Sequence, residues 1–299
     1  MPDIDRPRGV FVGLATLDVV HRVDAQPAAN EKITAAAQFV AAGGPAANAA
    51  ITFAGLGGAA VLITALGTDS VADLIRADLQ RHGVSVVDVT PDARTPAPVS
   101  AVAVTIANGD RSVVSIDAAA SEVAAPSDLR AQFRGADVVL IDGHHPRLAI
   151  AAAAAAQAEG VHVVVDAGRW KAVMVDIIPF ATSMVCSDDF RHPEAGDSRG
   201  TAVILVEKGV PVVVTTHGHR PVQWWHGGAS GSVEVPQIDA VDTLGAGDVF
   251  HGAYSYFSTF PQLDLATRLT QASRVAALRC SIIGPREWLS QLADLKSWS

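Results

Sequence analysis

The chain has 299 residues, of which 49% are hydrophobic, so it can bury a large core and is not expected to be disordered. Its net charge of -9 and its lack of Lys or Arg runs argue against sequence-independent nucleic-acid binding, which needs a basic face. Its two cysteines lie far apart, which argues against a disulfide scaffold, and its charged start lacks the apolar core of a signal peptide. We therefore expect a cytoplasmic protein without nucleic-acid or membrane partners.

The first third of the chain alternates between strand and helix patterns. Residues 9–14 predict a short buried strand, and a helix is expected to begin near Pro45, after a pair of glycines. A second strand is expected at 60–66, followed by an amphipathic helix at 71–82.

A β-rich region then interrupts this alternation. Residues 99–107 and 112–117 flank Asn108-Gly109, and an Asn-Gly pair between two such runs predicts a hairpin. Together with part of 19–40, this hairpin is expected to form a small sheet outside the main fold.

Strand and helix patterns resume from residue 136. This alternation predicts a mostly parallel sheet with helices on both faces. The expected strands are 138–142, 161–166, 183–187 and 211–216, and the expected helices are 148–159, 201–207, one from about Val249, and 265–280.

The most informative segment is 242–248, with the sequence DTLGAGD. Its two glycines allow a tight turn and close backbone approach to a ligand. The helix expected after it presents N–H groups and a positive dipole end, which favour anions. Asp248 stands at this helix start, where its carboxylate either does chemistry or merely caps the helix.

The segment DTLGAGDVFHGA resembles the C-terminal motif of the ribokinase-like (PfkB) carbohydrate kinases, written DTxGAGD. The resemblance implies that Gly245, Ala246 and Gly247 form an anion hole for the γ-phosphate of ATP. It also implies that Asp248 is the catalytic base that takes the proton from the attacking hydroxyl.

A second segment, GGPAAN at 43–48, resembles the N-terminal GGxxxN motif of the same family. The resemblance implies that it contributes to the sugar site. The substrate-binding residues it implies are Asp18, Gly43, Gly44, Asn48 and Arg169, and the nucleotide-binding residues are Thr216, Gly218 and Thr243.

The resemblance covers nearly the whole chain and implies a three-layer α/β/α ribokinase-like fold with a small β-sheet lid. We expect a single kinase domain over residues 1–299, with lid segments at about 15–42 and 97–118. ATP and Mg²⁺ are the implied cofactors, a K⁺ requirement stays open, and lids that pair between subunits predict a homodimer.

Two departures from the family pattern bear on metal and substrate. The family's N-x-x-E element, which organises Mg²⁺, is replaced at 187–190 by SDDF. Whether Asp188 or Asp189 takes over its role stays open, and no metal-binding residue is assigned. Pro45 stands where ribokinases often have Lys, which argues against ribose. The residues of both motifs, GGPA and DVFHGA, resemble those of the sulfofructose and ketohexose kinase branch.

Two alternatives remain open. One is a nucleoside or vitamin-alcohol kinase of the same fold, and the other is a non-catalytic sugar or nucleotide sensor, which the altered stretch at 187–190 would suit. A Rossmann dehydrogenase is disfavoured because the first strand is not followed by G-x-G-x-x-G.

Overall fold

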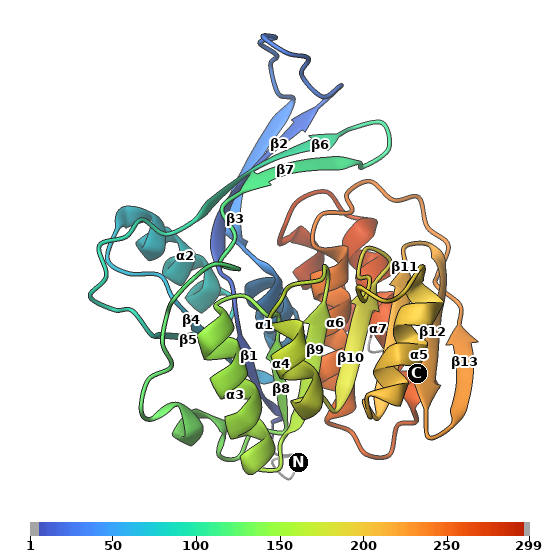
Figure 1. The fold of residues 1–299 in the computed structure, drawn as a ribbon. Helices are drawn as coiled ribbons and strands as arrows, with labels where there is room; N and C mark the ends of the chain where they lie inside the picture. The colour runs from blue at the N-terminus through green and yellow to red at the C-terminus, as the bar shows by residue number, and fades with distance from the viewer. Residues whose placement is uncertain (1–5, 296–299) are drawn as a thin grey trace.

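The computed structural model describes residues 6–295, and within them the main sheet has nine strands in the order β13-β12-β11-β10-β9-β8-β1-β4-β5 (Figure 1). The first seven of these strands along the chain run parallel to one another, and β12 and β13 extend one edge in antiparallel fashion. The strands are β1 (Arg8–Val12), β4 (Ala59–Thr64), β5 (Val84–Asp88), β8 (Val138–Ile141), β9 (His162–Ala167), β10 (Ser183–Ser187), β11 (Val212–His217), β12 (Arg220–His226) and β13 (Ala229–Val233).

Helices cover both faces of this sheet, which confirms the predicted three-layer architecture. Successive strand residues point to opposite faces, so Phe11 enters one buried cluster while Val10 and Val12 enter the other. One face is covered by α1 (Pro45–Gly55), α2 (Ser70–Arg81), α6 (Ala246–Ser258) and α7 (Leu265–Cys280). The other is covered by α3 (Pro146–Ala158), α4 (Met174–Ile177) and α5 (Ser198–Glu207).

Four further short helical pieces complete the described chain. They are the 3₁₀ helices η1 (Leu129–Phe133), η2 (Ile178–Phe180) and η3 (Glu287–Gln291), and α8 (Leu292–Leu295). Among residues 6–295, no helix combines the length and apolar character that a membrane crossing requires.

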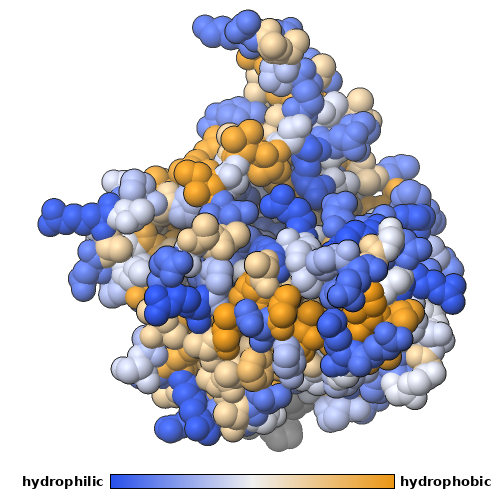
Figure 2. Space-filling view, in the orientation of Figure 1, coloured by the Kyte–Doolittle hydropathy of each residue, from blue (hydrophilic) through white to orange (hydrophobic). Residues whose placement is uncertain are grey.

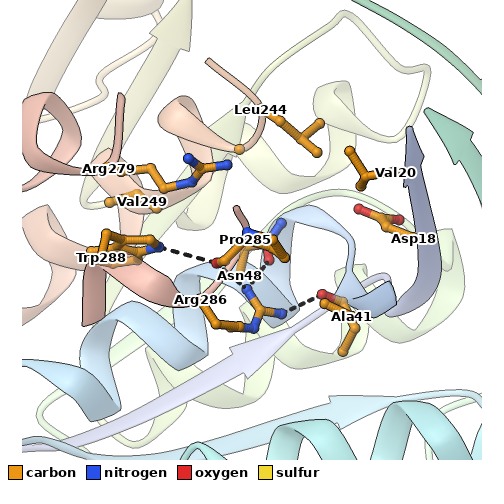
Figure 3. A pocket seen from close by; sticks show the side chains of 12 residues that line it. Asp18, Val20, Ala41, Asn48, Leu244, Val249, Arg279, Pro285, Arg286 and Trp288 are labelled. Carbon is orange, nitrogen blue, oxygen red and sulfur yellow. Dashed lines mark hydrogen bonds between the residues drawn. The ribbon is translucent and has the colours of Figure 1, made fainter. Parts of the chain in front are cut away.

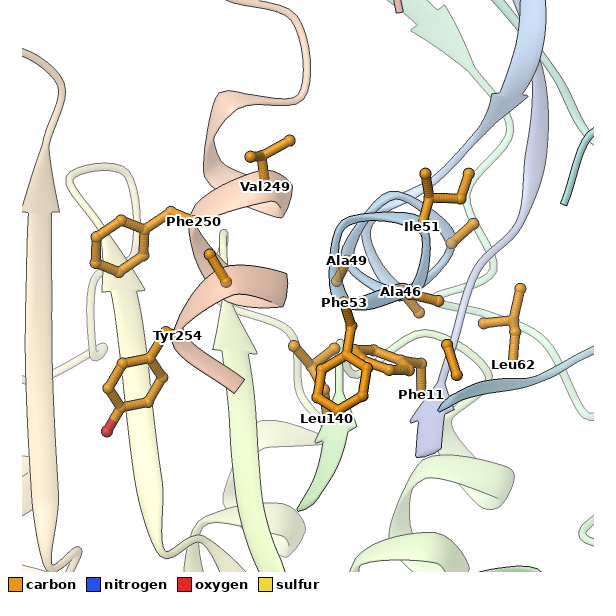
Figure 4. Close-up of a cluster of buried hydrophobic side chains, with 14 of the residues drawn as sticks. Phe11, Ala46, Ala49, Ile51, Phe53, Leu62, Leu140, Val249, Phe250 and Tyr254 are labelled. Carbon is orange, nitrogen blue, oxygen red and sulfur yellow. The ribbon is translucent and has the colours of Figure 1, made fainter. Parts of the chain in front are cut away.

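Helices α1 and α6 pack side by side on the sheet, and their contact sets the position of the site described below (Figure 4). Gly252 makes this approach possible, because a Cβ atom at that position would lie 2.3 Å from the carbonyl oxygen of Ala49. Beneath α1, the rings of Phe11 and Phe53 meet edge to face with centroids 5.4 Å apart.

A separate four-stranded sheet, in the order β3-β2-β6-β7, projects from the main body (Figure 1). It confirms the small sheet expected from the sequence, including the hairpin at Asn108-Gly109, where Gly109 has a φ of 70°. Its strands are β2 (Thr16–Val23), β3 (Ala37–Gly43), β6 (Val99–Thr105) and β7 (Arg111–Ser115).

Candidate active site

Asp248 lies at the amino end of α6, where the sequence placed the key carboxylate, but the helix begins earlier than expected. Its first residue is Ala246 rather than one near Val249, and Gly245 is the N-cap with a φ of 72°, a left-handed conformation that suits glycine. Asp248 therefore belongs to the first helical turn. The Ala246 N–H donates to the Thr243 carbonyl at 3.3 Å. The other N–H groups of the first turn and the helix dipole still favour an anion at this helix start.

Asn48 joins the two predicted motifs. Its Nδ2 donates to Oδ2 of Asp248 at 2.8 Å, and its Oδ1 accepts from Nη1 of Arg286 at 3.3 Å. These two bonds fix the orientation of the amide, because a carboxylate only accepts and a guanidinium only donates. Asn48 therefore presents its donor to Asp248.

Arg286 is a site residue that the sequence analysis missed. It follows α7 and also contacts the Ala42 carbonyl and Oδ2 of Asp78, the latter from Nη2 at 3.2 Å. No motif marks it, because a single Arg after a helix is an ordinary C-terminal feature. Its role emerges only from its contact with Asn48 (Figure 3).

Asp18 faces the same pocket from β2. Thr16 Oγ1 donates to its Oδ1 at 2.6 Å, and burial raises the pKa of Asp18, with the Thr16 and Ser100 hydroxyls and Arg286 opposing that effect. The backbone of Gly43 passes so closely that a Cβ atom there would lie 2.0 Å from Asp18 Oδ2.

Two of the predicted substrate residues, Asp18 and Asn48, line this pocket, and Gly43 and Gly44 lie beside it, since Gly43 approaches Asp18 and Gly44 is the N-cap of α1. Figure 3 shows Asp18, Asn48 and Arg286 facing one another across it. The residues that line it are Asp18, Val20, Ala41, Ala42, Asn48, Leu244, Gly245, Val249, Arg279, Pro285, Arg286 and Trp288.

Asp142 holds the surrounding elements in place. It follows β8 directly, and its Oδ2 accepts from the N–H groups of Leu14 (2.9 Å) and Ala46 (3.2 Å). Its Oδ1 accepts from the His144 N–H at 2.8 Å. Although burial opposes ionisation, His144 and Lys171 hold the pKa of Asp142 far below its usual range. This carboxylate thereby connects the ends of β1 and β8 to the start of α1.

The environment of Asp248 raises the pKa of its carboxyl group. Burial and the nearby carboxylate of Asp166 raise the pKa of Asp248 to about 6, against the lowering effects of Asn48 and His251. His251, one turn further along α6, has Nδ1 3.2 Å from Asp166 Oδ2 and Nε2 3.2 Å from the Val185 carbonyl. Burial lowers the pKa of His251, but the Asp166 carboxylate outweighs it, so the net direction is upward.

None of the three predicted nucleotide residues lines this pocket. Thr216 is near the end of β11, and Gly218 has a φ of 63° in the turn to β12. Thr243 Oγ1 donates to the Gly109 carbonyl at 3.0 Å and accepts from Arg111 Nη1 at 3.2 Å. The tip of the small sheet thus contacts the segment that leads into α6.

Arg169 does not line the Asp18 pocket. Its side chain is 75% exposed, with Nη2 3.8 Å from Oδ2 of Asp117, in a second hollow that Trp170 and Lys171 also line. Asp166, three residues before Arg169 in the sequence, faces His251.

Asp188, one of the two candidate metal acids, is already paired. Its Oδ1 lies 2.8 Å from Nδ1 of His217, and its Oδ2 accepts from Nη2 of Arg220 at 2.8 Å. The His217 hydrogen bond and these charges lower the pKa of Asp188. Neither Asp188 nor Asp189 belongs to a metal cluster, because residues 6–295 contain no group of three or more His, Cys, Asp or Glu side chains placed to hold a cation.

Comparison with known proteins bears on the family and the fold of this chain. The model of the pfkB family carbohydrate kinases matches residues 7–291. An ATP-dependent ribose-1-phosphate kinase of Halopiger xanaduensis is 29% identical over 93% of this chain and 94% of its own length. Ribokinase from Giardia lamblia superimposes with a TM-score of 0.82 at 20% identity, over 98% of this chain and all of that one. Arabidopsis thaliana ribokinase complexed with ribose and ATP gives 0.79 at 21%, covering 98% and 99%.

The raised pKa of Asp248 predicts that Asp248→Asn stabilises the fold at pH 8. The folded state holds this proton up to about pH 6, whereas the unfolded carboxyl releases it near 3.8, so stability falls as the pH rises between these values. The shift corresponds to roughly 3 kcal/mol at pH 8. Urea unfolding of both proteins at pH 4 and pH 8 measures it, with exposed Asp24→Asn as the control. Equal stability of Asp248→Asn and the parent protein at pH 8 would refute the pKa assignment.

Proposed function

Because the chain belongs to the pfkB family of carbohydrate kinases, we propose that it transfers the γ-phosphoryl group of ATP to a hydroxyl of a sugar or sugar derivative, as a single kinase domain. The observation that supports this most is the partly buried carboxylate of Asp248, which accepts a hydrogen bond from Asn48 at the start of α6. This arrangement brings a proton acceptor, an anion-binding helix end and a polar pocket together.

The acceptor sugar binds in the pocket between the two motifs. Asp18 and Asn48 offer acceptors and donors for sugar hydroxyls, and the backbone at Gly43 and Gly44 approaches closely enough to add further contacts. Asp248 takes the proton from the attacking hydroxyl. Its pKa of about 6 keeps it ionised at neutral pH while leaving it basic enough to accept that proton.

The phosphates of ATP meet the amino end of α6. The amides of Gly245, Ala246 and Gly247 and the helix dipole stabilise negative charge on the transferred group, which phosphoryl transfer needs more than covalent chemistry. The nucleotide extends along the carboxyl edge of the sheet toward Thr216 and Gly218, and Thr243 supports the loop. Mg²⁺ would bind together with the phosphates and neutralise their charge. Asp188 and Asp189 stand in the stretch 187–190, where the family carries its N-x-x-E element.

Because both motifs resemble those of the ketohexose and sulfofructose kinases, we propose that the acceptor is a ketohexose or a sulfofructose. Position 45, at the start of α1, is Pro, and no Lys is among the described residues that line the pocket. The small sheet closes over this pocket as a lid, since Gly109 and Arg111 contact Thr243, and a closed lid excludes the water that would otherwise hydrolyse ATP.

The proton-acceptor role predicts that Asp248→Asn lowers turnover by about 10²–10⁴-fold, because general base catalysis contributes in that range. Affinity for ATP should change little, since the amides and the helix dipole remain. Coupled ADP-release kinetics and nucleotide titration measure the two quantities, with Asp24→Asn as the matched control. Turnover of Asp248→Asn close to that of the parent protein would eliminate Asp248 as the base.

We also propose that the lid pairs with the lid of a second copy. Val40, Val19, Ala101 and Val114 occupy paired positions across all four strands, and Val40 and Val114 are 50% and 76% exposed. Figure 2 shows apolar side chains gathered over this sheet. An exposed apolar row of this kind is typical of an interaction surface.

The lid interface predicts that Val114→Glu converts a dimer into a monomer, because the buried charge would lack a partner. Sedimentation velocity at micromolar concentration measures the mass. Val203→Glu, at an exposed valine of α5, is the control and should remain dimeric. A monomeric parent protein, or a Val114→Glu variant that stays dimeric, would contradict the lid interface.

A further inference from the structure

A buried guanidinium lies behind the segment that leads into α6. Arg279, in the last turn of α7, is 2% exposed. Its Nη2 lies 3.1 Å from Oδ2 of Asp242, and its Nη1 donates to the Ile282 carbonyl at 3.1 Å and to the Asp242 carbonyl at 3.4 Å. One side chain therefore satisfies three oxygens that come from two separate segments.

The partner carboxylate links those segments. Asp242 Oδ1 accepts from the Leu244 N–H at 3.1 Å, which shapes the turn into Gly245, and its Oδ2 accepts from the Gly284 N–H at 3.2 Å. Asp242 is 3% exposed. A carboxylate so deeply buried needs a cation beside it, since an uncompensated buried charge is strongly destabilising.

A monovalent metal ion does not fit at this place. K⁺ would need carbonyl and carboxylate oxygens free of other cations. In the part of the chain that the structure describes, Arg279 already binds Oδ2 and the carbonyl oxygen of Asp242 and the carbonyl oxygen of Ile282. A second cation would face the guanidinium at close range, where the repulsion is only weakly screened.

We propose that Arg279 is a built-in cation that positions the anion-binding loop through Asp242, so that the enzyme needs no exchangeable monovalent cation. The inference rests on the phosphoryl transfer proposed above. Arg279 acts as a positioning residue, because it touches the loop's carboxylate and carbonyl rather than the reacting atoms. A fixed guanidinium also provides directed hydrogen bonds, which a spherical ion does not.

The first test uses the unaltered protein. Its turnover is measured with Na⁺, K⁺ or tetramethylammonium as the only monovalent cation, at equal ionic strength. The proposal predicts rates equal within about twofold, because the loop carries its own cation. Activation by K⁺ of about tenfold or more over tetramethylammonium would overturn it.

The second test removes the guanidinium. Arg279→Met should lose about 100-fold in turnover, since displacing a loop by about 1 Å costs that much. Added guanidinium ion should restore part of the rate and raise the melting temperature of this variant. Arg268→Met, which changes a half-buried arginine of α7 that donates to the Phe260 carbonyl, is the control and should show neither response.

The outcomes separate this inference from the proposed function. Turnover of Arg279→Met equal to that of the parent protein would refute the positioning role. If the parent protein transfers no phosphoryl group in any salt, the kinase proposal fails. The built-in cation is then judged by melting alone, where guanidinium must stabilise Arg279→Met and not Arg268→Met, and equal responses would overturn it.

Discussion

The hydrogen bond between Asn48 and Asp248 is the constraint on which the site depends. It joins two residues 200 positions apart, with 2.8 Å between Nδ2 of Asn48 and Oδ2 of Asp248, and so holds the starts of α1 and α6 together. The close helix contact at Gly252 makes this bond possible. Both glycine segments therefore open at the same carboxyl edge of the sheet, where ligands of open α/β folds gather. If the two helices moved apart, the acceptor pocket and the anion-binding loop would no longer face each other.

Although the chain carries a net charge of -9, basic side chains lie beside several carboxylates near the site. Asp242 lies beside Arg279, Asp78 beside Arg286 and Asp166 beside His251. Asp248 differs, because its hydrogen-bond partner among the described side chains is the neutral amide of Asn48. Burial then raises its pKa to about 6, so the carboxylate without a direct cationic partner is also the basic one. An ionised carboxylate that lacks a direct cationic partner lowers the stability of the fold, and such groups are typical of catalytic positions.

The sequence predicted the layered fold, the small sheet and the two glycine segments, because these depend on local patterns of hydrophobicity and backbone freedom. It placed the start of α6 too late, since Gly245 and Gly247 read as loop residues although only Gly245 needs the left-handed conformation. It missed Arg286 and the pairing of Asp166 with His251, because these contacts join segments that only tertiary packing brings together.

The measurement that tests the central claim most directly is acceptor-dependent ADP release with MgATP, with the product identified by mass spectrometry. The acceptors are fructose, fructose 6-phosphate, sulfofructose, ribose, ribose 1-phosphate, 2-keto-3-deoxygluconate, tagatose 6-phosphate and adenosine. A sugar that releases ADP in step with its own gain of one phosphoryl group is the predicted result, and a ketose should be preferred. Bound ATP without acceptor-dependent ADP release from any sugar would contradict the account.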